Sequence, residues 1–179
     1  MTTSLLSDAF AHHVWATERL IDACTALTRE QLTTPTPGAL GSIMDLLGDL
    51  VGADGWYLSF FSEEAVGFAS TTLADFRSVA SSNGQMWMQV LSEELDPDKD
   101  VVARDDEGGE FHAPVGLRLA QVIHHGSDHR SQVCTAMTSL GVTPPLIDLW
   151  DFGEATGRTR DLPAPAREFR ASDTPTVET

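Results

Sequence analysis

Four long segments, in which apolar side chains recur about every 3.6 residues, constrain the fold of this chain more than any other feature. Prolines and glycines interrupt the chain between them, as at Pro35, Pro37 and Gly38. The periodicity predicts helices over Leu5–Leu27, over Ile43–Phe61, from Thr71 or Thr72 to about Leu95, and over Val115–Leu140. Four amphipathic helices in one domain predict an all-α four-helix bundle, because each helix must bury its apolar stripe against the others.

The stretch before the last predicted helix has a different pattern. In Val101–Pro114, two short runs flank a turn rich in Asp, Glu and Gly, which predicts a small β-hairpin. After the fourth helix, Leu146–Gly157 is interpreted as a structured connector, and the end of the chain is rich in Pro, Ala, Thr and charge. We therefore expect one domain over residues 1–158 and an extended or loosely ordered tail over 159–179.

The composition excludes several classes of protein. The 179 residues include 27 acidic and 11 basic ones, a net charge of -16, which would repel nucleic-acid phosphates. Cys24 and Cys134 form no CxxC pattern, so a reducing cytoplasm is the default. No signal peptide is recognised, and no apolar run approaches the roughly 18 residues that span a bilayer. A soluble, cytoplasmic protein with no nucleic-acid or membrane partner is expected.

His125 and His129 are the strongest candidates for a functional pair. Their four-residue spacing places both imidazoles on one side of a helix, a geometry that offers two nitrogen ligands to one metal ion. Both positions fall on the flank of the apolar face, where they could also be boundary residues with ordinary hydrogen bonds. His124 falls on the solvent side with Asp128, and these two are interpreted as a surface pair.

A metal site needs a third ligand, and the second predicted helix offers Asp45, Asp49 and Asp54. Asp49 falls on the flank of its helix. Asp54 falls nearer the centre of the apolar face, where a buried carboxylate needs a partner, so it could be a paired core residue or a ligand. Helical geometry alone does not decide between Asp49 and Asp54, and it mildly favours Asp54. His12 and His13 on the first predicted helix are weaker candidates.

The segment His125–Val133, His-Gly-Ser-Asp-His-Arg-Ser-Gln-Val, resembles the fourth-helix signature of the DinB (DNA-damage-inducible) family. That family includes thiol-dependent transferases and mycothiol-dependent maleylpyruvate isomerase. Gly41–Leu58 resembles its second helix, Trp15–Ala23 its first, and Leu140–Trp150 the stretch after the fourth. The resemblance covers about residues 5–158 and implies a bundle with an up-down-down-up arrangement.

The resemblance also implies a set of metal ligands. The family's triad is one histidine on helix two and two on helix four. The helix-four pair corresponds to His125 and His129, but the helix-two position is occupied by Asp49, which departs from the family pattern. The resulting candidate set, Asp49, His125 and His129, suits a divalent Ni, Zn, Fe or Mn ion. The same departure is also consistent with a metal that is bound weakly or has been lost.

Two kinds of function remain open. The first is a metal-dependent enzyme acting on small molecules, either a transferase that uses a low-molecular-weight thiol or a hydrolase. The second is a non-catalytic dimeric bundle with a vestigial metal site that binds or sequesters a ligand. A homodimer is an expectation carried by the family resemblance alone.

Other conspicuous side chains receive structural interpretations. Trp56 and Trp87, at helical spacing, are expected in the core or at an interface. We expect His112 to be exposed, and Arg130 and Gln132 to orient loops or bind water rather than act in catalysis. Both cysteines are expected to be unreactive.

Overall fold

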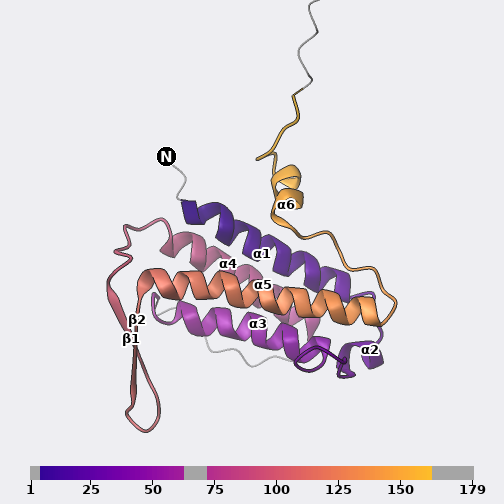
Figure 1. Ribbon diagram of the computed structural model, residues 1–179, viewed down its shortest axis with the longest axis horizontal. Helices are drawn as coiled ribbons and strands as arrows, with labels where there is room; N and C mark the ends of the chain where they lie inside the picture. Colours follow the sequence, from indigo (N-terminus) through magenta and orange to yellow (C-terminus); the bar gives the residue numbers. More distant parts are fainter. Residues whose placement is uncertain (1–4, 63–71, 163–179) are drawn as a thin grey trace, which may run out of the picture.

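A computed structural model of the chain describes residues 5–62 and 72–162. Within these ranges the protein contains six helices and one two-stranded hairpin (Figure 1). The long helices are α1 (Leu5–Cys24), α3 (Ile43–Leu58), α4 (Leu73–Val90) and α5 (Val115–Ser139). They pack into the predicted bundle, so the all-α prediction is confirmed. The shorter elements are α2 (Arg29–Thr33), β1 (Asp100–Arg104), β2 (Glu110–Pro114) and α6 (Leu149–Ala155).

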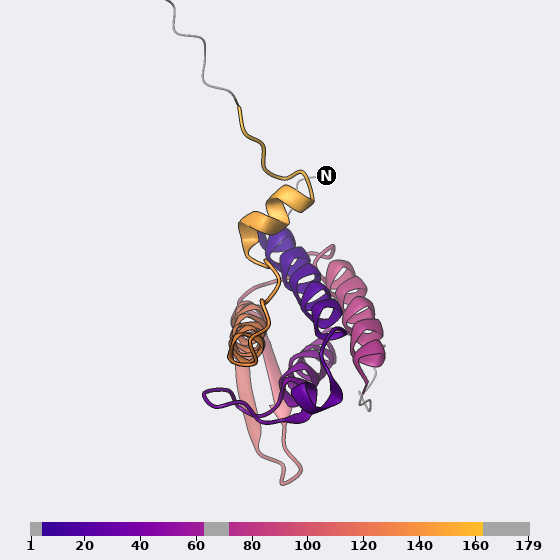
Figure 2. The same ribbon diagram turned by 90° about the vertical axis from the view of Figure 1, so that its right-hand side faces the viewer.

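Contacts along the helices establish their directions. Near the start of α3, the Leu40 amide donates to Gln132 in the second half of α5, and just past the end of α3, Phe60 stacks on Arg118 in the first turn of α5. Helices α3 and α5 are therefore antiparallel. Helix α1 is antiparallel to α4, because Phe10 packs on Trp87 and the Arg77 side chain binds Asp22. The end of α1 packs against the start of α3, so these two helices are also antiparallel. The order is therefore up-down-down-up, as expected from the resemblance, and Figure 2 shows the bundle from its end.

Capping residues explain where the helices begin. Ser42 and Asp45 form the reciprocal capping box that starts α3, and Thr72 caps α4 by accepting from the Asp75 amide. Thr71, the alternative start, lies outside the described residues. Thr28 and Gln31 form another capping box, and it starts α2. The sequence interpretation treated that stretch only as a break, because a five-residue helix is too short to show periodicity.

Three helices end three or more residues earlier than predicted. Helix α1 ends at Cys24 instead of Leu27, α3 at Leu58 instead of Phe61, and α4 at Val90 instead of Leu95. In each case following amides bond to the carbonyl three residues back, as Leu27 does to Cys24 at 3.1 Å, Phe61 to Leu58 at 2.8 Å and Glu93 to Val90 at 3.3 Å. The chain thus tightens into a final 3₁₀-like turn, which apolar periodicity cannot distinguish from α-helix.

The core of the bundle consists of two apolar clusters, one toward each end. The first lies where the end of α1 meets the start of α3 and the end of α5, and includes Leu20, Ile21, Leu46, Leu47, Val133 and Met137. The second lies at the opposite end and includes Phe10, Leu58, Trp87, Val115, Leu119 and Val122. Trp87 is fully buried, as predicted, whereas Trp56 is 51% exposed and is not a core residue.

A layer of buried polar side chains lies between the two clusters. Each of the four long helices contributes to it. We call it the central polar layer, and its members are His13 and Thr17 from α1, Asp54 from α3, Asn83 from α4 and Arg130 from α5. Each of these residues is at most 7% exposed, so their polar groups depend on protein partners, and not on bulk water, for hydrogen bonds.

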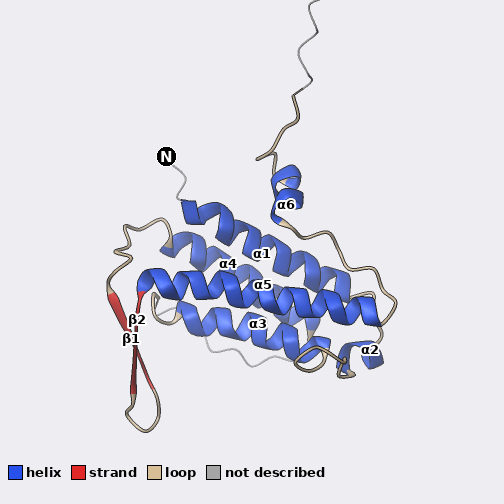
Figure 3. Cartoon of the chain, in the orientation of Figure 1, coloured by secondary structure: helices blue, strands red, loops and turns tan. Residues whose placement is uncertain are grey.

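The predicted hairpin is present and leads directly into α5 (Figure 3). Its strands pair antiparallel from Asp100 opposite Pro114 to Arg104 opposite Glu110. Gly108 has a φ of 86° in the connecting turn, a conformation that favours glycine. His112 is exposed, as predicted, and its ring nitrogens contact Asp100 and Glu110.

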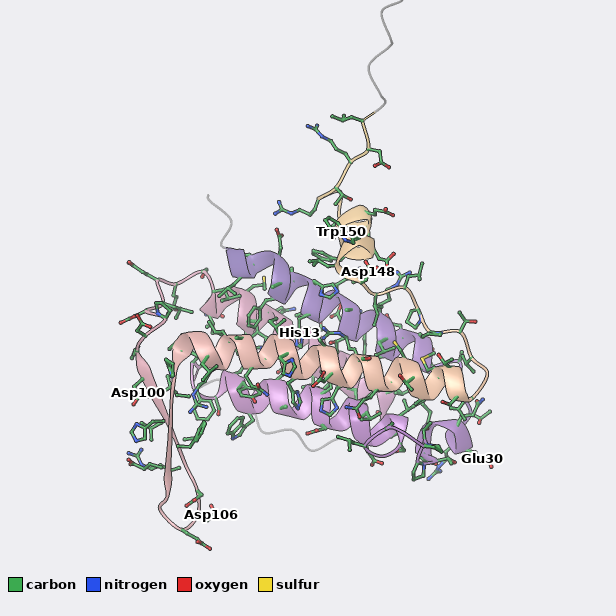
Figure 4. All side chains as sticks on the ribbon, viewed as in Figure 1. His13, Glu30, Asp100, Asp106, Asp148 and Trp150 are labelled. Atoms are coloured by element: carbon green, nitrogen blue, oxygen red, sulfur yellow. The ribbon has the colours of Figure 1, made fainter. Side chains whose placement is uncertain are left out.

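The segment after α5 contains a short helix. The sequence predicted a structured connector there, and α6 begins within it because Asp148 accepts from the amides of Trp150 and Asp151. Figure 4 shows Asp148 and Trp150 above α1, and α6 packs on that helix through the rings of Phe152 and Trp15. The predicted tail, 159–179, falls mostly on residues 163–179, which lie outside the described ranges.

Both cysteines are expected to be unreactive in the folded protein. Burial raises the pKa of Cys24 to about 12 and also raises the pKa of Cys134. A thiol with a pKa near 12 holds about a thousandfold less thiolate at pH 8 than an ordinary cysteine. In a titration with Ellman's reagent, Cys24 should therefore react only after denaturation. Complete reaction of both thiols within minutes in native buffer would contradict this.

Candidate metal site

Three side chains from α3 and α5 converge on one flank of the bundle. His129 Nε2 lies 3.2 Å from Asp49 Oδ2, and His125 Nε2 lies 3.9 Å from the same oxygen. The two imidazole ring centres are 4.3 Å apart, one helical turn from each other. One ligand atom from each residue lies within 4.8 Å of those of the other two. Asp49, His125 and His129 are the three residues that the sequence put forward as ligands.

The three ligand groups lie close together, but no hydrogen bond joins either histidine to Asp49. The distance from His125 Nε2 to Asp49 Oδ2, 3.9 Å, is beyond hydrogen-bonding range, and the 3.2 Å contact of His129 lacks hydrogen-bond geometry. An arrangement of this kind can accommodate a shared cation.

Burial and exposure give the site a closed and an open side. The side chains of His129 and His125 are 9% and 21% exposed, whereas that of Asp49 is 63% exposed. Burial, and then the neighbouring His129, lower the pKa of His125. A lowered pKa favours the neutral imidazole, which is the form that donates a lone pair to a metal. The histidines form the inner wall and the carboxylate faces solvent.

Asp54 belongs to the central polar layer and not to this group. Its Oδ2 lies 2.8 Å from His13 Nε2, and His13 Nδ1 lies 2.9 Å from Arg130 Nη1 (Figure 4). A guanidinium can only donate, so His13 Nδ1 accepts and Nε2 carries the proton that it donates to Asp54. Of the two roles that the sequence left open for Asp54, metal ligand or paired core residue, the structure supports the second. The contact with His13 compensates for the burial of its carboxylate.

Arg130 differs from its sequence-based interpretation. It was expected to orient loops or bind water, but it is 4% exposed and donates to His13 and to Thr17 Oγ1. Burial lowers its pKa to about 10, so it remains charged at neutral pH. Gly126 makes room for this contact, because a Cβ there would lie 2.3 Å from His13 Cε1. In the sequence, the feature that could have indicated this close approach of α5 to His13 is the glycine at position 126.

The remaining histidines and the flanking glutamine occupy separate positions. His12 Nε2 lies 2.9 Å from the Ile147 carbonyl oxygen, so neither His12 nor His13 belongs to the cluster. His124 and Asp128 form the expected surface pair at 3.6 Å. Gln132 accepts from the Leu40 amide and thereby holds the loop before α3, as expected.

A pocket of about 820 Å³ borders the site on the Asp49 side. It lies between α2, α3 and the start of α4, and has one cationic side chain, Arg29, beside the carboxylates of Asp45 and Asp49. Its apolar walls are Leu32, Met44, Leu73 and Phe76. This volume is within the range of small-molecule sites.

The fold and this cluster define a class: four-helix bundles with candidate metal ligands on two antiparallel helices. The chain belongs to the DinB family, whose model matches residues 1–162. A crystal structure of a DinB-like protein from Bacillus cereus ATCC 10987 is similar in fold, with a TM-score of 0.59 and 20% identity. The similarity covers 83% of this chain and 100% of that one. No curated protein matches the chain.

Within the described residues, none of the helices combines the length and apolar character that crossing a bilayer requires.

Proposed function

We propose that Asp49, His125 and His129 bind one divalent metal ion and that the protein is a metal-dependent enzyme acting on small molecules. The observation that carries this proposal is the convergence of the three ligand atoms from two helices within 4.8 Å. Two ligands that are each about 2.1 Å from a metal lie about 3–4 Å apart. The contacts of 3.2 and 3.9 Å to Asp49 Oδ2 agree with that spacing.

The donor set indicates which metals fit and how tightly. Two imidazole nitrogens and one carboxylate oxygen suit Zn²⁺, Ni²⁺, Fe²⁺ or Mn²⁺. A metal-bound histidine usually donates its second nitrogen to a fixed acceptor, but His129 Nδ1 is buried and has no hydrogen-bond partner among the described residues. The Asp49 side chain is also 63% exposed. We therefore expect weaker metal binding than in sites with a complete outer shell of hydrogen bonds.

The chain's own residues suggest how the site would work. Three protein ligands would leave room for a water or thiol, whose pKa a bound ion would lower toward neutrality. The two histidines hold the inner wall and keep water away from one side. The exposed Asp49 and the adjacent pocket provide the entry side for a substrate.

Membership of the family supports a thiol transferase, in which a low-molecular-weight thiol attacks an electrophilic substrate. Hydrolysis is the alternative in which water attacks instead. The competing function is a non-catalytic bundle that sequesters a ligand. It is supported by the presence of Asp49 at the position where the family has histidine. We also propose that the protein is a cytoplasmic homodimer and that it has no nucleic-acid partner.

Metal uptake by the untagged protein tests the proposal. Wild type incubated with Zn²⁺ or Ni²⁺ and desalted should retain about one ion per chain by elemental analysis, whereas Asp49→Ala should retain much less. Wild type that takes up neither ion would overturn the metal site. Equal uptake by Asp49→Ala would overturn only the choice of the third ligand.

Activity of the loaded protein then separates the enzyme classes. Metal-loaded wild type is incubated with glutathione or cysteine and 1-chloro-2,4-dinitrobenzene, and in parallel with p-nitrophenyl acetate without thiol. Thiol-dependent turnover supports a transferase, and thiol-independent turnover supports a hydrolase. Metal binding with no turnover of either kind favours the non-catalytic bundle.

A further inference from the structure

A second pocket lies where the end of α3 meets β2 and the start of α5. Its volume is about 300 Å³. The lining residues are Trp56, Tyr57, Phe111, Leu117, Arg118 and Gln121, together with Ala113. Among the described residues, the lining is therefore largely aromatic and apolar, with one charged side chain.

Arg118 is a buried cation that has no counter-charge among the described residues. It is 3% exposed, and its Nη2 donates to the carbonyl oxygens of Val101 at 2.9 Å and Phe111 at 3.4 Å. No carboxylate in the described part of the chain forms an ion pair with it, and its buried Nε has no hydrogen-bond partner within those residues. A buried charge normally has a compensating partner, so this pocket is electrostatically prepared for an anion.

The start of α5 adds to the positive potential. Helices α2, α3, α4 and α6 each have an acidic residue in the first turn and a side-chain cap. Helix α5 has neither, since its N-cap is Pro114. The positive end of its dipole is thus not offset by any acidic side chain of its own first turn, and Leu117 and Arg118 of this turn line the pocket.

The walls fit a flat apolar body. Trp56 and Phe111 are 51% and 64% exposed, although both are large aromatic residues. The Arg118 guanidinium lies 4.3 Å from the ring centre of Phe60 and 5.8 Å from that of Phe111. These stacked groups offer faces on which a planar ligand can stack in turn.

We propose that this pocket binds a small aromatic carboxylate, with its ring against Trp56 and Phe111 and its carboxylate toward Arg118. Tyr57 connects the pocket to the candidate metal site, because its ring centre lies 6.4 Å from that of His125. Gln121 precedes His125 by one helical turn. The inference that aromatic acids are the substrate class rests on the proposed function. Binding of an aromatic acid in this pocket does not require the metal.

Calorimetric titration of the full chain in EDTA, with 1-naphthoate as the probe, tests this proposal. A ligand of about 13 non-hydrogen atoms should give a dissociation constant on the order of 0.1 mM. The uncharged 1-naphthamide has the same rings and nearly the same shape, and should bind about tenfold more weakly if the Arg118 charge selects the acid. Equal affinities, or no binding of naphthoate at millimolar concentration, would overturn the proposal.

A matched pair of variants locates the binding. Leu117→Glu places a negative charge in the pocket wall and should weaken naphthoate about tenfold, while Leu117→Gln should change it less than threefold. Leu117 is 60% exposed, and glutamate suits the first turn of a helix, so both variants should fold. His129→Ala should bind naphthoate as wild type does, which separates this pocket from the metal site. Loss of binding in His129→Ala would overturn the assignment to this pocket.

Discussion

Replacing His129 with alanine is expected to lower the affinity for Zn²⁺ or Ni²⁺ on the order of a hundredfold or more, because loss of a ligand exceeds the tenfold to hundredfold effect of losing an outer-shell partner. His129 is the least exposed of the three candidate ligands and lies closest to Asp49. Its loss would leave His125 and a solvent-exposed carboxylate, a two-ligand set that cannot compete well with water.

His124→Ala is the matched control for this prediction. His124 is adjacent to His125, but its side chain is 70% exposed and forms a surface ion pair with Asp128. Its removal should leave the affinity within about threefold of wild type. Competition with a chromophoric chelator measures all three affinities, and circular dichroism checks that the variants are folded. Similar affinities for His129→Ala and wild type would place the metal elsewhere.

Replacing Asp54 with alanine is expected to lower the free energy of unfolding by about 3–5 kcal/mol, because it removes the carboxylate that offsets the buried charge of Arg130 through His13. Asp54 accepts from His13, and His13 in turn accepts from Arg130. Without the carboxylate, the charge of Arg130 would remain buried at 4% exposure, with no other carboxylate of the described residues to offset it. The His13 Nε2 proton would also lose its acceptor.

Asp49→Ala provides the comparison on the same helix. In EDTA, where no metal contributes, this exposed residue should change the free energy of unfolding by about 0.5 kcal/mol or less. Urea denaturation followed by circular dichroism gives both values. Asp54→Asn, which keeps an acceptor oxygen but not the charge, should fall between the two. If Asp54→Ala were as stable as Asp49→Ala, the polar layer would not contribute to stability as described.

The sequence predicted the helices well because their signals are local. Periodicity and capping residues such as Ser42 and Thr72 depend only on neighbours along the chain. The same local reasoning could place Asp49 and Asp54 on their helix, but it mildly favoured Asp54 as a ligand. The deciding fact is that α1 presents His13 to Asp54, which depends on how two distant helices rotate against each other.

Arg130 was misinterpreted for a related physical reason. Helical geometry gives the direction of the Cβ atom, whereas a long side chain leans back toward the N-terminus and can reach a neighbouring helix. Arg130 does this across Gly126, and its guanidinium contacts α1. Nothing in the spacing along α5 specifies where α1 lies.

The central polar layer also determines how the helices align lengthwise. The two apolar clusters on either side of it have similar side chains, and packing alone would tolerate a helix displaced by one turn, about 5.4 Å. Such a slip would bring Arg130 against leucines and phenylalanines and would separate Asp54 from His13. The interior charges therefore select one alignment of α3 against α5, and that alignment is what brings a carboxylate on one helix opposite two imidazoles on the other.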